Sequence, residues 1–262
     1  MNKTKMPLLF IGHGSPMNGI EDNYFTKNWR AEFLKLPTPS AVLCISAHWY
    51  TNGTFVTGHE SPETLYDFGG FPDELYSIKY PAKGNTSLTK KIINSSNSES
   101  IIADVNRGYD HGTWSVLRKM IPDASIPLLQ LSMNFNNSPD WHFKYAKFLA
   151  PLRSEGVLIL GSGNIVHNLG KVDFSKINTK GYGYDWAISI NNLFKQKIME
   201  KDYKSLINYQ NFGSEARLAI PTVEHYLPLL YILGLREEGE RLEFFNDELV
   251  GGSLSMTSLK IY

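Results

Sequence analysis

Short apolar runs without a polar face recur along this chain and alternate with longer segments of helical spacing. Several of the runs, such as VLILG, are hydrophobic on both faces, as strands are when helices cover both sides of a sheet. The alternation predicts an α/β fold with a largely parallel or mixed central sheet flanked by helices. The predicted strands are 7–12, 41–46, 54–58, 101–105, 126–132 and 157–161, and the predicted helices are 24–36, 87–95, 113–120, 139–153, 185–200 and 224–233.

Three details of the pattern make predictions about single elements. Ser138 is a candidate N-cap for the helix at 139–153, and Pro139 suits its first turn. The C-terminal stretch SLSMTSLKIY alternates apolar and polar residues, which predicts a final strand with one solvated face. The stretch 93–100, rich in serine and asparagine, is expected to form a surface loop.

Length and composition limit the classes of protein that the chain can belong to. At 262 residues and 42% hydrophobic, it can bury a sizeable core, and we expect a single domain spanning 1–262. Basic and acidic residues number 26 each, so no basic excess is present to bind nucleic acid or a membrane surface. Because Cys44 is the only cysteine, no internal disulfide forms, and we expect a soluble cytoplasmic protein. The oligomeric state stays open.

Histidines follow three of the predicted strands, and a fourth opens a predicted helix. His13, His48 and His167 come where apolar runs end, and His225 lies in PTVEHYLPLL. Because ligands of open α/β sheets bind at the carboxyl ends of the strands, these imidazoles predict a metal site at that edge. The chain has no cysteine cluster and no HExxH motif, so the pattern favours mononuclear iron, zinc or manganese over a structural zinc finger.

Two of these histidines have competing interpretations. The Gly-Ser-Gly stretch before His167 could cradle a phosphate, but it lacks the glycine pattern of dinucleotide sites and the lysine of a P-loop. Glu224 is also a candidate ligand beside His225. In a helix the two residues differ by about 100°, so they should not both face one metal.

Of the remaining three histidines, one is a candidate site residue, and the other two lie beside no comparable motif. His111 lies beside Asp110, which is itself a candidate N-cap of the following helix. We assign His59 and His142 to the surface or to helix packing.

Seven motifs, taken together and in order, resemble the extradiol ring-cleavage dioxygenases of the class III, LigB-like superfamily, and within it the DOPA-dioxygenase-type branch. They are GHGSPMN (12–18), SAHWYT (46–51), YDFGGFP (66–72), DHGTW (110–114), GSGNIVHNL (161–169), PTVEHYLPLL (221–230) and GSLSMTSL (252–259). The resemblance covers nearly the whole chain and is specific as a set.

The resemblance implies a three-histidine metal site. His13 and His48 correspond to two ligands and His225 to the third, while Glu224 is the competing third ligand because related enzymes use a glutamate there. His167 corresponds to the acid/base histidine, although in zinc-bound members of this branch it can be a fourth ligand. His111 corresponds to a second catalytic histidine that contacts the substrate hydroxyl or oxygen.

The resemblance also implies a pocket, a substrate and a metal. Tyr66, Asp67 and Phe68 would bind substrate, but Gly69 stands where the family has an aromatic residue, which should widen or loosen that side. The implied activity is extradiol opening of a catechol, DOPA or similar, by O₂ to a muconic semialdehyde. Fe(II) is the expected cofactor, and Zn(II) is a metal that such a site also binds.

Two other functions remain as alternatives at this point. A zinc-dependent hydrolase could use the same metal site, with metal-bound hydroxide attacking an ester or amide. A metal-storage or ligand-binding module would bind metal without turnover.

Overall fold

The computed structural model describes residues 5–96 and 99–262. Its strands are β1 (Leu8–Gly12), β2 (Ala41–Thr51), β3 (Thr54–Thr57), β4 (Ile101–Asp104), β5 (Leu128–Asn134), β6 (Val157–Gly163), β7 (Leu242–Phe245), β8 (Leu249–Val250), β9 (Leu254–Ser255) and β10 (Ser258–Ile261). Its α-helices are α1 (Tyr24–Leu34), α2 (Asp73–Tyr76), α3 (Thr86–Ser95), α4 (His111–Met120), α5 (Pro139–Tyr145), α6 (Ala150–Ser154), α7 (Asp185–Met199), α8 (Tyr203–Ile207), α9 (Ser214–Ala219) and α10 (Leu227–Gly234).

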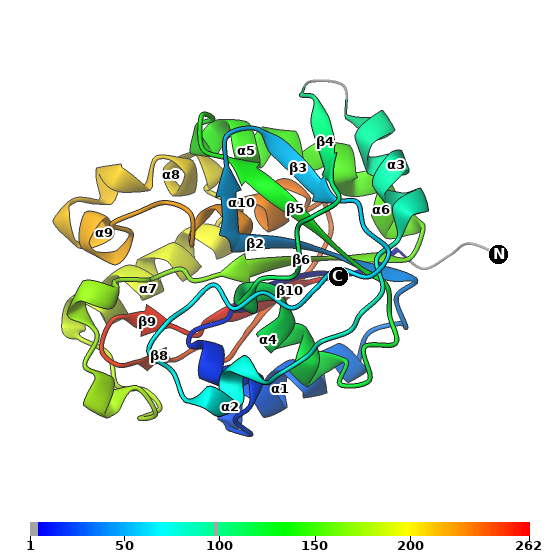
Figure 1. Cartoon of the computed structure of the whole chain (residues 1–262). Coiled ribbons are helices and arrows are strands. Elements are labelled where there is room, and N and C mark those ends of the chain that lie inside the picture. Colours follow the sequence, from blue (N-terminus) through cyan, green and yellow to red (C-terminus); the bar gives the residue numbers. More distant parts are fainter. Residues whose placement is uncertain (1–4, 97–98) are drawn as a thin grey trace.

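One mixed sheet of eight strands forms the centre of the protein, in the order β4-β3-β5-β2-β6-β1-β10-β7 (Figure 1). The central pairs β5/β2, β2/β6 and β6/β1 are parallel, whereas β10 runs antiparallel to both of its neighbours. β3 is parallel to β4 and antiparallel to β5. The predicted α/β class with a largely parallel or mixed sheet is confirmed.

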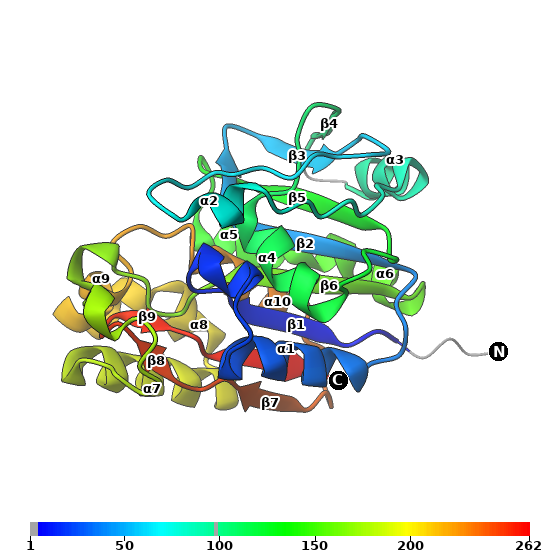
Figure 2. The ribbon, with the colours of Figure 1, turned by 60° about the horizontal axis from the view of Figure 1, so that its bottom comes forward.

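Helices cover both faces of the sheet, as the two-sided apolar runs predicted (Figures 1 and 2). Successive residues of β1 alternate between two cores: Leu8 and Phe10 pack in the core that includes α10, and Leu9 and Ile11 pack in the core that includes α1 and α4. All four side chains are fully buried. Burial on this scale, at about 25 cal/mol per Å² of apolar area, is the main force that stabilises the sheet between its helical layers.

The helix predicted at 139–153 begins as expected but does not continue unbroken. Ser138 accepts a hydrogen bond from the backbone N–H of Trp141 and therefore caps α5. A 3₁₀ segment then separates α5 from α6. The break follows from Pro151, which has no N–H to donate to the carbonyl four residues earlier.

Two further predictions differ from the structure. The C-terminal strand β10 is buried on both faces, because it lies between β1 and β7 instead of at the edge of the sheet. The stretch 93–100 is not wholly a loop, since α3 extends to Ser95; residues 97 and 98 of that stretch lie outside the described residues. In the described ranges 5–96 and 99–262, no helix is both long enough and apolar enough to cross a membrane.

Candidate metal centre

Three of the predicted ligands lie close together in the structure, two in or directly after sheet strands and one in the segment before α10. His13 follows β1 directly, as predicted. His48 lies inside β2 and not after it, in the stretch where the pairing of β2 with β5 shifts between Ile45 and Tyr50. His225 precedes α10 instead of opening it, because the helix begins at Leu227. The two boundaries predicted from sequence were therefore wrong, although the side chains still converge.

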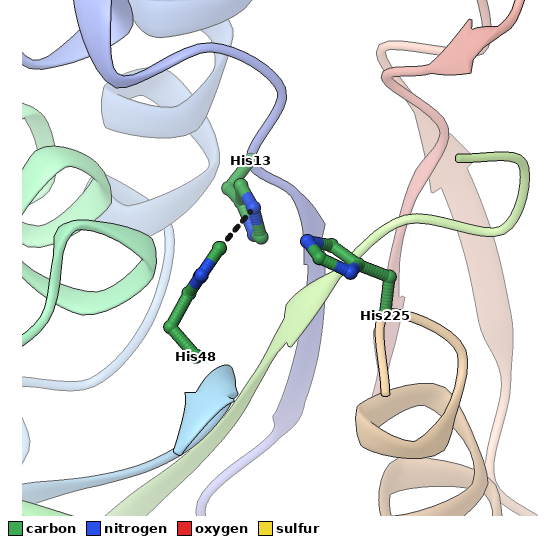
Figure 3. A group of neighbouring side chains, drawn as sticks. All are labelled: His13, His48 and His225. Atoms are coloured by element: carbon green, nitrogen blue, oxygen red, sulfur yellow. Dashed lines mark hydrogen bonds between the residues drawn. The ribbon is translucent and has the colours of Figure 1, made fainter. Parts of the chain in front are cut away.

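The three imidazoles lie close enough to share one ion. His13, His48 and His225 each offer a ligand atom, and these atoms lie within 4.8 Å of one another (Figure 3). The Nε2 atoms of His13 and His48 are 3.1 Å apart. Two nitrogens that each bind a metal at about 2.0–2.1 Å lie roughly this far from each other. We call His13, His48 and His225 the histidine cluster.

A serine beneath the cluster fixes the tautomer of His13. Ser162 Oγ donates its hydrogen to the carbonyl of Gly112 and lies 3.0 Å from His13 Nδ1. Because the single hydroxyl hydrogen is already used, Ser162 must accept from His13 Nδ1–H. The lone pair of His13 Nε2 consequently faces the other two rings.

Carboxylates lie beside the far nitrogens of the other two cluster rings. His225 Nδ1 lies 3.1 Å from Glu224 Oε1, and His48 Nδ1 lies 3.5 Å from Asp67 Oδ2. His225 Nε2 is buried without a hydrogen-bond partner among the described residues. A buried nitrogen without a partner is costly unless it binds something, so this atom fits a metal ligand. Hydrogen bonds from the far nitrogen of a ligating histidine typically orient it in this way.

Burial and mutual repulsion keep the cluster uncharged. Burial is the largest cause that lowers the pKa of His13, and repulsion from His48 and His225 lowers it further. Burial likewise lowers the pKa of His225 well below its usual value, followed by repulsion from His167. Neutral imidazoles are the form that binds metal. The cluster therefore has the electrostatic state that a divalent cation requires.

Glycines in β6 allow the segment with His225 to approach the sheet. A Cβ atom on Gly163 would lie 2.2 Å from the carbonyl oxygen of His225, a distance that no side chain permits. The next residue, Asn164, donates its backbone N–H to that same carbonyl at 2.8 Å. The Gly-Ser-Gly stretch thus serves close packing and His13 anchoring, which explains it without a phosphate.

His167 and His111 flank the histidine cluster without belonging to it. The ring of His167 stacks on that of His225, with centroids 3.5 Å apart and planes at 6°. Burial lowers the pKa of His167 to about 4. His111 is the first residue of α4, and its backbone N–H and Nδ1 both contact Asp67 Oδ1, at 2.9 and 3.0 Å. His48, Asp67 and His111 form a second group that could hold a metal, but its carboxylate is already engaged by His111.

A cavity of about 870 Å³ opens above the cluster, and all five predicted active-site histidines line it. Asp67 and Phe68 line the cavity too, as the resemblance implied. Tyr66 does not: its hydroxyl donates to the carbonyl of Ile78, and its ring packs against Phe68 and Trp114. Gly69 lines the cavity, and a Cβ atom there would meet nothing within 4 Å.

A buried polar network that sequence reasoning missed supports the start of α4. Asp110 caps the helix as predicted, accepting from the backbone N–H of Thr113. Its fully buried carboxylate also accepts from Ser46 Oγ at 2.7 Å, from Gln130 Nε2 at 2.6 Å and from Arg107 at 3.2 Å. Ser46 and Gln130 come from the strands β2 and β5, far from Asp110 in the chain, so the sequence DHGTW indicated only the helix cap. The network fixes the position from which His111 enters the cavity.

Comparisons with known proteins identify similar proteins over nearly the whole chain. The family described as the catalytic LigB subunit of aromatic ring-opening dioxygenase matches residues 7–254. A protein of Escherichia coli (strain K12) named 4,5-DOPA dioxygenase extradiol is 43% identical over 100% of this chain and 96% of its own length. A Beta vulgaris protein of the same name is 34% identical over 96% of this chain and 94% of its own length.

A solved structure is similar over almost the entire chain. The crystal structure of an uncharacterized protein from Escherichia coli K12 is 39% identical, with a TM-score of 0.85, and the match covers 98% of this chain and 100% of that one. The chain therefore belongs to the LigB family of aromatic ring-opening dioxygenases, and the predicted resemblance is confirmed.

Proposed function

We propose that this protein opens the ring of a catechol, DOPA or a similar compound, with O₂ to give a muconic semialdehyde. The observation that carries the proposal is the convergence of three neutral imidazoles, of which His13 and His225 are buried and His48 is partly exposed, at a cavity of about 870 Å³. The names of the relatives from Escherichia coli and Beta vulgaris support DOPA as the first substrate to test.

His13, His48 and His225 would hold the metal, which we propose to be Fe(II). When bound, such a metal would supply Lewis acidity toward the catechol and the redox chemistry toward O₂ that no side chain provides. The position of Glu224, behind the far nitrogen of His225, supports the histidine and not the glutamate as the third ligand.

The flanking histidines would move the protons of the reaction. His167 lines the cavity beside His225, where its imidazole can take a proton from a catechol hydroxyl and later return it. His111, held by Asp67 through both its backbone N–H and Nδ1, would contact the second substrate oxygen. The apolar residues Phe68, Phe71 and Leu169 would exclude water while the ring is attacked.

No comparison supports the alternative of a zinc hydrolase, and the family described as ring-opening dioxygenases argues against it. We also propose a cytoplasmic location, because the single, buried Cys44 makes no demand for an oxidising compartment.

Reconstitution with metal tests the proposed reaction. The metal-free protein is loaded anaerobically with Fe(II), mixed with DOPA and exposed to air, while oxygen consumption and the visible spectrum are recorded. We expect oxygen uptake that matches a new yellow chromophore, and none with zinc-loaded protein. Absence of uptake with DOPA and simpler catechols, at full iron occupancy, would refute the proposal.

The role of His167 needs a separate test. His167→Ala should lower turnover far more than iron content if the residue acts as acid and base. An equal loss of iron in His167→Ala and His13→Ala would instead make His167 a fourth ligand.

A further inference from the structure

We propose that Glu21 recognises a positively charged amine on the side chain of the catechol, so that the enzyme prefers catechols with an alkylammonium group over catechol carboxylates. This inference rests on the proposed function, since it concerns the substrate of the same cavity. Nothing in the names of the relatives or in the motifs assigns a role to Glu21.

The charges that line the cavity are the first argument. Among the described residues, the wall of the cavity contains two carboxylates, Glu21 and Asp67, and neither lysine nor arginine. Asp67 already contacts His48 and His111, so its charge is engaged by the active site. An anionic substrate tail would find no cationic partner here, whereas a cationic tail would find Glu21.

The second argument is that few protein groups engage the carboxylate of Glu21. In the described part of the chain, Glu21 forms no ion pair, and the one hydrogen bond to its side chain is a long one of 3.4 Å from Asn23 Nδ2. The adjacent Asp22 differs, because it pairs with Lys119 at 2.7 Å and does not line this cavity. Glu21 therefore keeps acceptor sites available for a ligand.

The position of Glu21 relative to the histidine cluster is the third argument. Asn18 Nδ2 donates to the carbonyl of His13 at 2.9 Å, and Asn18 Oδ1 accepts from Asn23 Nδ2 at 2.8 Å. Asn23 Nδ2 in turn contacts Glu21. Two asparagine side chains thus connect the backbone of His13 to Glu21, on a half-buried turn after the 3₁₀ helix Pro16–Gly19. Glu21 and the histidine cluster therefore line one cavity, within which a substrate could contact both.

Three catechols that differ mainly in the charge of the substituent test the proposal. Wild type and Glu21→Gln are loaded with Fe(II), and kcat/KM is measured by oxygen uptake for dopamine, 4-ethylcatechol and 3-(3,4-dihydroxyphenyl)propanoate. We expect wild type to prefer dopamine. Glu21→Gln should lower kcat/KM for dopamine about tenfold, as for loss of one charge-assisted hydrogen bond, and leave 4-ethylcatechol unchanged. Asp22→Asn is the matched control and should change neither value.

The affinity of each catechol for zinc-loaded protein can be measured by calorimetry under nitrogen, and this measurement needs no turnover. Weaker binding of dopamine but not of 4-ethylcatechol to Glu21→Gln would support the proposal. Equal effects on both ligands, no effect on either, or the same loss in Asp22→Asn would overturn it. If iron-loaded wild type turns over none of the catechols, the proposed function fails, and the binding data still decide the role of Glu21.

Discussion

The floor and the rim of the cavity are built in opposite ways. At the floor, His13 and His225 are buried and His48 is partly exposed. Ser162 and Glu224 form hydrogen bonds with the far nitrogens of His13 and His225, and Asp67 lies 3.5 Å from that of His48. At the rim, apolar side chains are open to solvent: Leu169 is 57% exposed and Phe174 is 70% exposed. The rim side chains rest on loops and short 3₁₀ helices, whereas two of the floor histidines lie in or directly after central strands.

This difference separates chemistry from selectivity. A metal centre needs its ligands fixed to within about half an ångström, which strands and buried hydrogen bonds provide. Recognition of a substituent tolerates looser elements, and exposed apolar side chains lose surface when a ligand covers them. Changes at the floor should therefore abolish metal binding and turnover, while changes at the rim should alter only the affinity for substrate.

Loss of a floor ligand should have the largest effect. His225→Ala removes one of three imidazoles, and we expect metal binding to weaken by more than about a hundredfold, the upper end of the effect of losing even an outer partner. Metal content by atomic absorption and oxygen uptake measure the result. Exposed His59→Ala is the control. Full iron occupancy in His225→Ala would show that the cluster is not the metal site.

Loss of a residue that orients a cluster histidine should weaken metal binding less than loss of the histidine itself. Ser162→Ala removes the acceptor that fixes the tautomer of His13, and metal affinity should fall about 10–100-fold while the fold is retained. Competition with a chelator gives the affinity, and circular dichroism reports the fold. Ser115→Ala is matched, because Ser115 Oγ is also buried but has no hydrogen-bond partner among the described residues. Equal affinities in both variants would remove Ser162 from the site.

A buried histidine outside the cavity provides a second test of what burial does to an imidazole, because it makes the stability of the protein depend on pH. His142 has both nitrogens engaged, by Tyr231 and by the carbonyl of Asn134, and burial lowers its pKa from 6.5 to about 4. The unfolded chain therefore binds an additional proton between these pH values, and stability is lost as pH falls through this range.

His142→Gln should reduce this pH dependence. The slope of the unfolding free energy against pH should decrease by up to about 1.4 kcal/mol per unit between roughly pH 6.5 and 4. Urea denaturation of metal-free wild type and variant at several pH values measures the difference between their slopes. The histidine cluster is present in both proteins, so its contribution cancels in this difference. An unaltered slope in His142→Gln would contradict the burial argument.

A change at the rim should have the smallest effect. Phe174→Ala removes an exposed ring from the cavity wall, and KM for a catechol should rise about threefold with iron content unchanged, as expected for roughly half a kilocalorie of apolar contact. Steady-state oxygen uptake checks this. Ile102→Ala, which removes an exposed apolar side chain far from the cavity wall, should leave KM unchanged. Loss of iron in Phe174→Ala would break the separation of rim from floor.

Local pattern alone determined much of this protein. Two-sided apolar runs specified the strands and the two helical layers, because burial on both faces leaves no polar positions in a strand. Histidines at the ends of those runs predicted the candidate metal site, and the motif set indicated the family. These signals are local in the chain, as are the caps formed by Ser138 and Asp110.

Tertiary structure decided what depends on residues far apart in the chain. β10 is buried because it inserts between β1 and β7, which no alternation in its own sequence reveals. Ser162 orients His13 across 149 residues, and Gln130 reaches Asp110 across 20. The register shift that keeps His48 inside β2 depends on its pairing with β5. Hydrogen bonds and packing between distant segments depend on how the whole chain folds. Residue type and spacing therefore indicated which histidines are candidate ligands, but not which side chains orient them.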